Sequence, residues 1–249
     1  MVPLPALRLM NGDECMGQKI RPTGFRTGIM TDWLSSWYAS KQDFSDLLVE
    51  DQKIRNFIKK AHPTAGIARI RIERTREKVV VYIWSSRVGS IIGKKGEKID
   101  KLTKDLESLT HRHIEVKTME VNRPETDAQL VAQDIAEQLE KRVSFRRTIK
   151  NAIQRAMENG AKGIRVQLSG RLGGAEMARC EKAMEGSIPL STLRAKVEYG
   201  FHEASTAQGN IGIKVWINTG DYLAPEESSD AVNAQAGKVQ KKSARQGKR

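Results

Sequence analysis

The 249-residue chain has few cysteines and no long apolar run, and each scarcity excludes a class of protein. Two cysteines, Cys15 and Cys180, cannot form a disulfide framework, so we expect reduced thiols in a cytosolic protein. No stretch of about 18 uncharged apolar residues occurs, which excludes a membrane-spanning helix. The apolar start, residues 2–10, is interrupted by prolines and an arginine and lacks a signal-peptide core. The sequence therefore predicts a soluble protein of the cytoplasm.

Catalytic and metal-binding patterns are also missing. The histidines lie in no ligand-spaced pattern with either cysteine, so a zinc site has no support. No Asp-x-Asp pair indicates a two-metal nuclease, and no serine has a nucleophile-elbow context. We therefore expect a protein that is not an enzyme, with no catalytic residue, metal, cofactor or small-molecule substrate.

Acidic residues are outnumbered by basic ones. The chain has 43 Lys and Arg against 30 Asp and Glu, a formal charge of +13, which indicates a polyanionic partner. Residues 224–249 are too polar to offset the entropy of ordering, so we expect a disordered tail, and a disordered extension over 1–15. The last part of the tail is basic. It is either a flexible arm attracted to phosphates or a solvated tail that aids solubility.

Hydrophobic periodicity in the first half predicts alternating helices and strands. Residues 43–60 have helical spacing, and 65–74 and 79–83 alternate as two strands joined by a short turn. A glycine-punctuated stretch, 89–96, then leads into a helical pattern and a strand at 114–116. The predicted order is helix, strand, strand, glycine turn, helix, strand.

The second half has its own pattern after an interruption at Arg123-Pro124. Helices are predicted over 131–139 and 145–157, followed by a strand at 164–168 and a short helix around 175–184. Two more strands follow, so we expect an α+β protein. The predicted division is a disordered extension at 1–15, an N-terminal segment at 16–53, a first domain at 54–122, a second domain at 123–223, and a disordered tail at 224–249.

The most informative motif is the G-x-x-G segment from Gly93 to Gly96, preceded by Ile91 and Ile92. The isoleucines are expected to anchor the turn to the core, and the glycines allow a phosphate chain to approach without a Cβ in the way. Between them, Lys94 and Lys95 are expected to face that chain. The helix that begins near residue 97 presents unpaired N–H groups to the same place, which favours anion binding.

This loop has two other interpretations. A P-loop needs four residues between its glycines and then Lys-Ser or Lys-Thr, whereas Gly89 and Gly93 enclose three residues and Lys94 is followed by Lys95. No hydroxyl is therefore placed to hold magnesium, which disfavours a nucleotide hydrolase. A bare G-x-x-G can also be an ordinary turn that enters a helix.

A second basic cluster lies on the predicted helix 145–157. At 100° per residue, Arg146, Arg147 and Lys150 fall within about 100° of arc and form one basic face. Phe145 and Ile149 lie on the apolar face, so the cations would project from a rigid element and grip a nucleotide strand. The simpler interpretation is a solvated helix face.

The order of elements around the glycine loop resembles a type II KH domain, which clamps about four nucleotides by their backbone. The resemblance extends to the family of bacterial small-subunit ribosomal protein number three, over about residues 16–222. It is carried by four stretches, Met16-Gly17-Gln18-Lys19, Gly93-Lys94-Lys95-Gly96, Phe145-Arg146-Arg147 and Ser169-Gly170-Arg171-Leu172-Gly173-Gly174-Ala175-Glu176.

This resemblance implies a structural constituent of the small-subunit head that binds ribosomal RNA in the cytoplasmic ribosome. It implies that Arg146, Arg147 and Lys150 border the messenger RNA entry channel, where they hold and passively unwind messenger. It also implies packing beside small-subunit proteins ten and fourteen. A second basic residue often follows the lysine in the family, whereas Asn151 stands here, which predicts a weaker grip. Because Met16 matches the family's start, residues 1–15 are either a real extension or the result of an early start codon.

Other assignments remain open at this level. Arg171 is a candidate RNA contact, although a surface arginine in a strand-to-helix turn would explain it equally well. Most aromatic side chains are expected to pack in the core. For Trp33, Trp37 and Tyr38 the alternative is that they dock against ribosomal RNA. An RNA- or DNA-processing enzyme, or a KH accessory to one, would use the same loop to capture substrate. A free-standing regulatory RNA-binding protein would show sequence preference.

Overall fold

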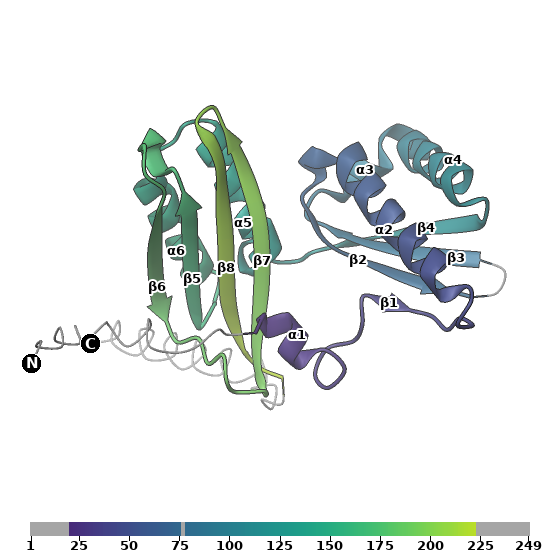
Figure 1. Ribbon diagram of the computed structural model, residues 1–249, viewed down its shortest axis with the longest axis horizontal. Helices are drawn as coiled ribbons and strands as arrows, with labels where there is room; N and C mark the ends of the chain where they lie inside the picture. The colour runs from purple at the N-terminus through teal and green to yellow at the C-terminus, as the bar shows by residue number, and fades with distance from the viewer. Residues whose placement is uncertain (1–19, 76–77, 223–249) are drawn as a thin grey trace, which may run out of the picture.

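The chain folds into two lobes, each built on its own four-stranded sheet (Figure 1). The computed structural model describes residues 20–75 and 78–222. The first lobe contains strands β1 to β4 and the second contains β5 to β8. The predicted disordered ends, 1–15 and 224–249, lie outside the described residues.

The first lobe has the predicted order of elements. Its sheet order is β1-β2-β3-β4, in which β2 and β3 are antiparallel and β3 and β4 are parallel. A parallel pair needs a crossover connection, and the helices around the glycine loop supply it. The N-terminal segment contains α1 (Pro22–Arg26), and the elements of the first lobe are β1 (Ser35–Ser36), α2 (Phe44–Ala61), β2 (Ile67–Arg74), β3 (Lys78–Ser85), α3 (Val88–Ile92), α4 (Glu97–Thr110) and β4 (His113–Glu120).

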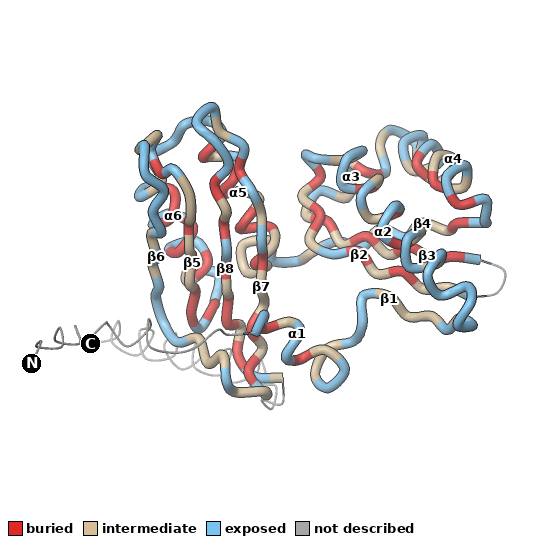
Figure 2. Tube along the Cα trace, in the orientation of Figure 1, coloured by how far each residue is buried: buried red, intermediate tan, exposed pale blue. Residues whose placement is uncertain are grey.

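The core of the first lobe follows from two periodicities. Val81 pairs with Ile72 on one side and Val116 on the other, so alternate residues of three strands share one face. Helix α2 adds Ile54 and Ile58 at a spacing of four residues, and both are fully buried. Figure 2 shows this buried layer between the sheet and its helices. Leu102 and Leu106 of α4 join the same core, which fixes the helix that follows the glycine loop to the sheet.

The second lobe is an antiparallel sheet of order β6-β5-β8-β7 with helices on one face (Figure 1). Side chains at 164, 166 and 168 alternate into the core, as predicted, and pack against small residues of the helices such as Ala132 and Ala156. The predicted helix 145–157 is confirmed. The elements are α5 (Ala128–Glu140), α6 (Phe145–Glu158), β5 (Gly163–Gly170), β6 (Arg179–Gly186), β7 (Ala195–Thr206) and β8 (Gly209–Asp221).

One predicted element of this lobe is wrong. Residues 175–184 were expected to form a short helix, but residues 179–186 form β6, which pairs with β5 along its whole length. Glu, Lys, Ala and Met in this stretch are good helix formers, and most of the strand is exposed, so period-2 burial is weak. Backbone pairing with β5 overrides the local propensity. The chain reverses before β6 through a turn in which Gly173 and Gly174 have φ of 66° and 79°.

The N-terminal segment connects the two lobes. The buried guanidinium of Arg26 donates to the carbonyls of Ala195 (2.6 Å) and Thr192 (2.7 Å), which fixes α1 to the second lobe. A few residues later, Ser35 pairs with β2 of the first lobe. The Gln133 side chain of α5 also donates to the Ile67 carbonyl, at 3.1 Å. The lobes therefore share several contacts, and the predicted domain boundaries stay a prediction.

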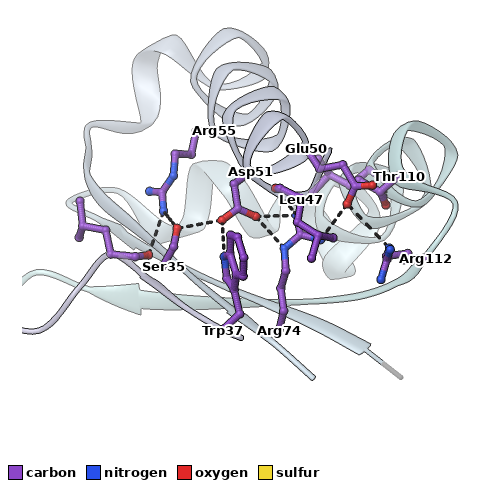
Figure 3. A network of polar contacts seen from close by, with 11 residues as sticks. Ser35, Trp37, Leu47, Glu50, Asp51, Arg55, Arg74, Thr110 and Arg112 are labelled. Atoms are coloured by element: carbon purple, nitrogen blue, oxygen red, sulfur yellow. Dashed lines mark hydrogen bonds and ion pairs between the residues drawn. The ribbon is translucent and has the colours of Figure 1, made fainter. Parts of the chain in front are cut away.

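A buried polar network fixes the same segment to α2 (Figure 3). One oxygen of the Asp51 carboxylate accepts a hydrogen bond from Arg74 Nε at 2.8 Å. The other accepts from the Ser35 hydroxyl (2.8 Å) and the Trp37 indole N–H (2.9 Å). Arg74 also pairs with Glu50 at 2.8 Å. The sequence left two roles open for Trp37, packing in the core or docking against RNA. In the structure its indole N–H belongs to this network.

Candidate nucleic-acid interface

The glycine loop between α3 and α4 has a backbone that needs its glycines. Gly93 and Gly96 have φ of 73° and 84°, in a region that residues with a Cβ rarely adopt. A Cβ on Gly93 would also lie 2.6 Å from the Lys98 side chain. Lys95 has a left-handed φ of 52°, which turns the two lysines outward at the tip of the loop. The loop is therefore a tight, preformed bend.

The loop borders a groove of about 460 Å³, whose lining includes Lys94, Lys98 and Glu97. Lys94 and Lys95 are exposed, and neither forms an ion pair within the described residues. Helix α4 begins at Glu97, as expected, so its first N–H groups lie beside these cations. Burial lowers the pKa of His62, and the charge of Lys98 lowers it further. The arrangement suits a phosphate chain.

The anchoring of the loop differs from the prediction at one residue. Ile91 is fully buried, as expected, whereas Ile92 is 36% exposed. Both residues lie at the end of the short helix α3, where successive side chains point about 100° apart. Here Ile91 faces the core while Ile92 lies partly in solvent, so the prediction that both anchor the loop is wrong.

The second candidate, the basic face of α6, is formed as predicted. Arg146, Arg147 and Lys150 are exposed, while Ile149 is buried against the second-lobe sheet. Within the described residues, none of these three cations forms an ion pair. The Arg146 guanidinium lies 5.7 Å from the centroid of the Phe145 ring. Three unpaired charges thus project from a helix that the core holds in place.

The structure adds a cation that sequence reasoning missed. Arg179 of β6 lies over the same Phe145 ring as Arg146, also at 5.7 Å. Its side chain is half exposed and lies 3.8 Å from the carboxylate of Glu181. Because a helix was predicted over 175–184, nothing in the sequence placed Arg179 beside α6. Pairing of β6 with β5 brings Arg179 to the Phe145 ring of α6.

Arg171, the third candidate, is exposed but has structural partners. Its Nε donates to the Ala175 carbonyl at 3.0 Å, and an Nη donates to the Gln208 carbonyl at 3.2 Å. These bonds tie the glycine turn before β6 to the hairpin between β7 and β8. The guanidinium is therefore held in place by two backbone groups, and its contact with RNA stays a prediction.

Residues 20–75 and 78–222 form neither a metal-ligand cluster nor a membrane-spanning helix. No group of three or more His, Cys, Asp or Glu side chains there is placed to hold a metal ion. None of the helices in the same ranges combines the length and apolarity that a membrane span needs.

Comparison with known proteins identifies both lobes. Residues 53–126 match the KH domain family, and residues 135–217 match the C-terminal domain of ribosomal protein S3. Small ribosomal subunit protein uS3 of Rhodopirellula baltica is 58% identical over 92% of this chain and 99% of its own length. The chain belongs to the uS3 family. The uS3 protein of Alkaliphilus oremlandii is 54% identical over 84% of this chain and 88% of its own. That of Caldanaerobacter subterraneus is 50% identical over 90% of this chain and all of its own.

Membership of the uS3 family confirms several predictions. The fold is α+β, with a KH domain followed by a helix-and-sheet domain. uS3 proteins are structural ribosomal proteins rather than enzymes, so the chain is a non-catalytic, RNA-binding constituent of the small subunit in the bacterial cytoplasmic ribosome. Within that subunit its polyanionic partner is ribosomal RNA. The processing-enzyme alternative is thereby removed.

Proposed function

We propose that this uS3 protein holds nucleotide chains by their phosphates at two rigid sites, one for structured RNA and one for the moving messenger. The first site is the loop from Gly93 to Gly96, where Lys94 and Lys95 meet the N-terminus of α4. The second is the basic face of α6, which borders the messenger RNA entry channel. The observation that carries the proposal is the same at both sites: exposed cations without acidic partners, mounted on elements that the core fixes.

Phosphate contacts suit a protein past which every messenger must move. Base-edge contacts would hold some sequences more tightly than others and slow their passage. Arg146, Arg147 and Lys150 lie on one helix flank, so they can hold one strand while translocation pulls a hairpin against them. Unwinding is then passive, because the energy comes from translocation and the protein only keeps the strands apart. At position 151 the family often has a basic residue, whereas this chain has Asn151, which weakens the hold of this helix face on the messenger.

We also propose that small-subunit proteins ten and fourteen pack beside the folded body. Apolar side chains of the N-terminal segment support this, because Ile20, Ile29 and Tyr38 are largely exposed in the isolated chain, Tyr38 at 96%. All three lie in the N-terminal segment, before α2. Burial of these side chains against the two proteins on assembly would account for their exposure in the isolated chain.

Replacing Arg146, Arg147 and Lys150 together by Ala tests the messenger role. We expect the variant to assemble into small subunits normally, because all three side chains are exposed. Translation through a hairpin placed at the entry side should slow several-fold, while translation of an unstructured messenger should be unchanged. The measurement is the rate of passage in a reconstituted translation system.

The matched control replaces Lys53, Lys101 and Lys104, three exposed cations on helices α2 and α4, by Ala. It removes the same charge without touching α6, and hairpin passage should stay at the wild-type rate. Equal rates for both triple variants would refute the channel role of α6.

A further inference from the structure

A cavity of about 770 Å³ lies between the two lobes, away from the glycine loop. The N-terminal segment, α2 and β2 line it from one side, and the start of α5 and β7 line it from the other. We call this cavity the inter-lobe cleft. In Figure 1 the segment from α1 to β1 runs below the two lobes. No residue of the loop or of the basic face of α6 lines it.

Three cations of the inter-lobe cleft have no acidic partner. Arg21, Lys59 and Arg69 are exposed, and within the described residues their side chains form neither an ion pair nor a hydrogen bond. Two other arginines of the cleft differ from them. Arg26 and Arg55 donate to backbone carbonyls and complete the fold. Arg21, Lys59 and Arg69 form no such bonds to the backbone within the described residues.

Aromatic rings orient two of the three free cations. The Arg69 guanidinium lies 4.7 Å from the centroid of Trp84, and that of Arg21 lies 4.7 Å from the centroid of Tyr199. A guanidinium that stacks on a ring keeps its N–H edges free, and these edges match the oxygens of a phosphate. One pair belongs to the first lobe, and the other links the N-terminal segment with the second. A strand that crosses the cleft would meet both.

A further aromatic side chain at the inter-lobe cleft is uncovered. Trp33 is 66% exposed, although an indole ring normally buries most of its area in a folded protein. Stacking on a base would cover it, and such stacking contributes about 1–3 kcal/mol per base whatever the base is. Sites for single-stranded nucleic acid combine exposed aromatic rings, on which bases stack, with cations that contact phosphates, and the inter-lobe cleft has both.

The carboxylates of the inter-lobe cleft do not cancel this charge. Asp127 accepts hydrogen bonds from the N–H groups of Gln129 and Leu130 and caps α5. Glu198 lies near it and pairs with Lys196 at 3.9 Å; burial raises the pKa of both carboxyl groups, and the nearby charges of Arg69 and Lys196 act in the opposite direction. Asp32 is exposed and pairs with Arg71 at 3.5 Å. Arg69 thus lies near two carboxylates without forming an ion pair with either, and within the described residues Arg21 and Lys59 form no ion pair.

We propose that the inter-lobe cleft is a second RNA-binding site, which takes a single-stranded segment with one base on Trp33 and its phosphates on Arg21, Lys59 and Arg69. The site is separate from the loop at residues 93–96 and does not depend on the role of that loop. It would let one RNA strand bridge the two lobes and fix their relative position.

The experiment compares two double variants of the full chain, Arg21→Glu with Lys59→Glu, and Lys53→Glu with Lys60→Glu. Both change the charge by the same amount, but Lys53 and Lys60 are exposed on α2 and do not line the cleft. Binding of a 12-nucleotide unstructured RNA is measured by fluorescence anisotropy. Both pairs are also placed in a background with Lys94→Asp and Lys95→Asp, so that the loop contributes nothing.

The cleft variant should bind about tenfold more weakly than the control in both backgrounds. Its salt slope should be smaller by about 1.4, because about 0.7 is lost per phosphate contact on a single strand. Photocrosslinks from a 4-thiouridine RNA should map to the peptide that contains Trp33. Equal affinities for the two variants, with no crosslink at Trp33, would overturn the proposal. A cleft variant that binds RNA normally but fails to assemble with other subunit proteins would likewise overturn it and assign the cleft to a protein partner.

Discussion

Replacing Lys94 and Lys95 by Asp is expected to weaken binding of single-stranded RNA by about a hundredfold without changing the fold. Each charge-assisted contact to a phosphate contributes roughly 1.5 kcal/mol or more, and two such contacts amount to about two orders of magnitude in affinity. The fold should survive because both side chains are exposed. Lys95 has a left-handed φ of 52°, which Asp tolerates better than most residues do.

The control for this variant is Lys101→Asp with Lys104→Asp, on the exposed side of α4 and beyond its first turn. It makes the same change in charge on the helix that the loop precedes. Affinity should fall by only a few-fold, through the general loss of positive charge. Circular dichroism and thermal melting should match the wild type for both variants. If the Lys94 and Lys95 variant loses its fold, the segment is a structural turn and its proposed role is wrong.

The largest effect on stability is expected for Arg74→Ala. The Arg74 and Asp51 side chains are each 4% exposed, and Arg74 forms the ion pair with Asp51 in the network of Figure 3. Removing one partner of a buried ion pair leaves an uncompensated charge and typically costs about 3–5 kcal/mol. The free energy of unfolding of the first lobe should fall by that amount in urea denaturation. The segment that carries Ser35 and Trp37 should loosen as well, because Asp51 accepts hydrogen bonds from both.

Arg112→Ala is the matched control, because Arg112 approaches Glu50 of the same network from outside. Its side chain is half exposed and the Nε–Oε2 distance is 3.8 Å. An exposed pair of this kind contributes about 0–1 kcal/mol. A loss of stability in Arg74→Ala no greater than in Arg112→Ala would show that the network does not hold α2 and the N-terminal segment together.

The sequence predicts the parts of this protein in which local pattern and final environment agree. The strands at 67–74 and 164–168 alternate because one face of each is buried, and the helix 145–157 keeps its apolar and basic faces apart. The glycine loop could be found because positive φ angles at Gly93 and Gly96 require glycine. Each of these features depends on a short stretch of consecutive residues, so the sequence alone predicts it.

Features that depend on distant residues could not be predicted in the same way. β6 is a strand because β5 lies beside it, although its residues favour a helix. Its misassignment also hid Arg179, which only the folded sheet brings to Phe145. The inter-lobe cleft combines residues from position 21 to position 222, and no local pattern connects them. Arg171 was found from its motif, but its carbonyl partners became visible only in the structure.

The central claim is that rigidly held cations bind nucleotide chains through phosphates and do not read bases. It is tested most directly by the salt dependence of binding to unstructured RNAs of different sequence. If about six phosphates are neutralised at roughly 0.7 per contact, a fourfold increase in salt should weaken binding by about 10²–10³. Oligomers of U, C and A should show the same slope and affinities within a few-fold of one another. A decrease of less than about tenfold, or a strong preference for one sequence, would contradict the account.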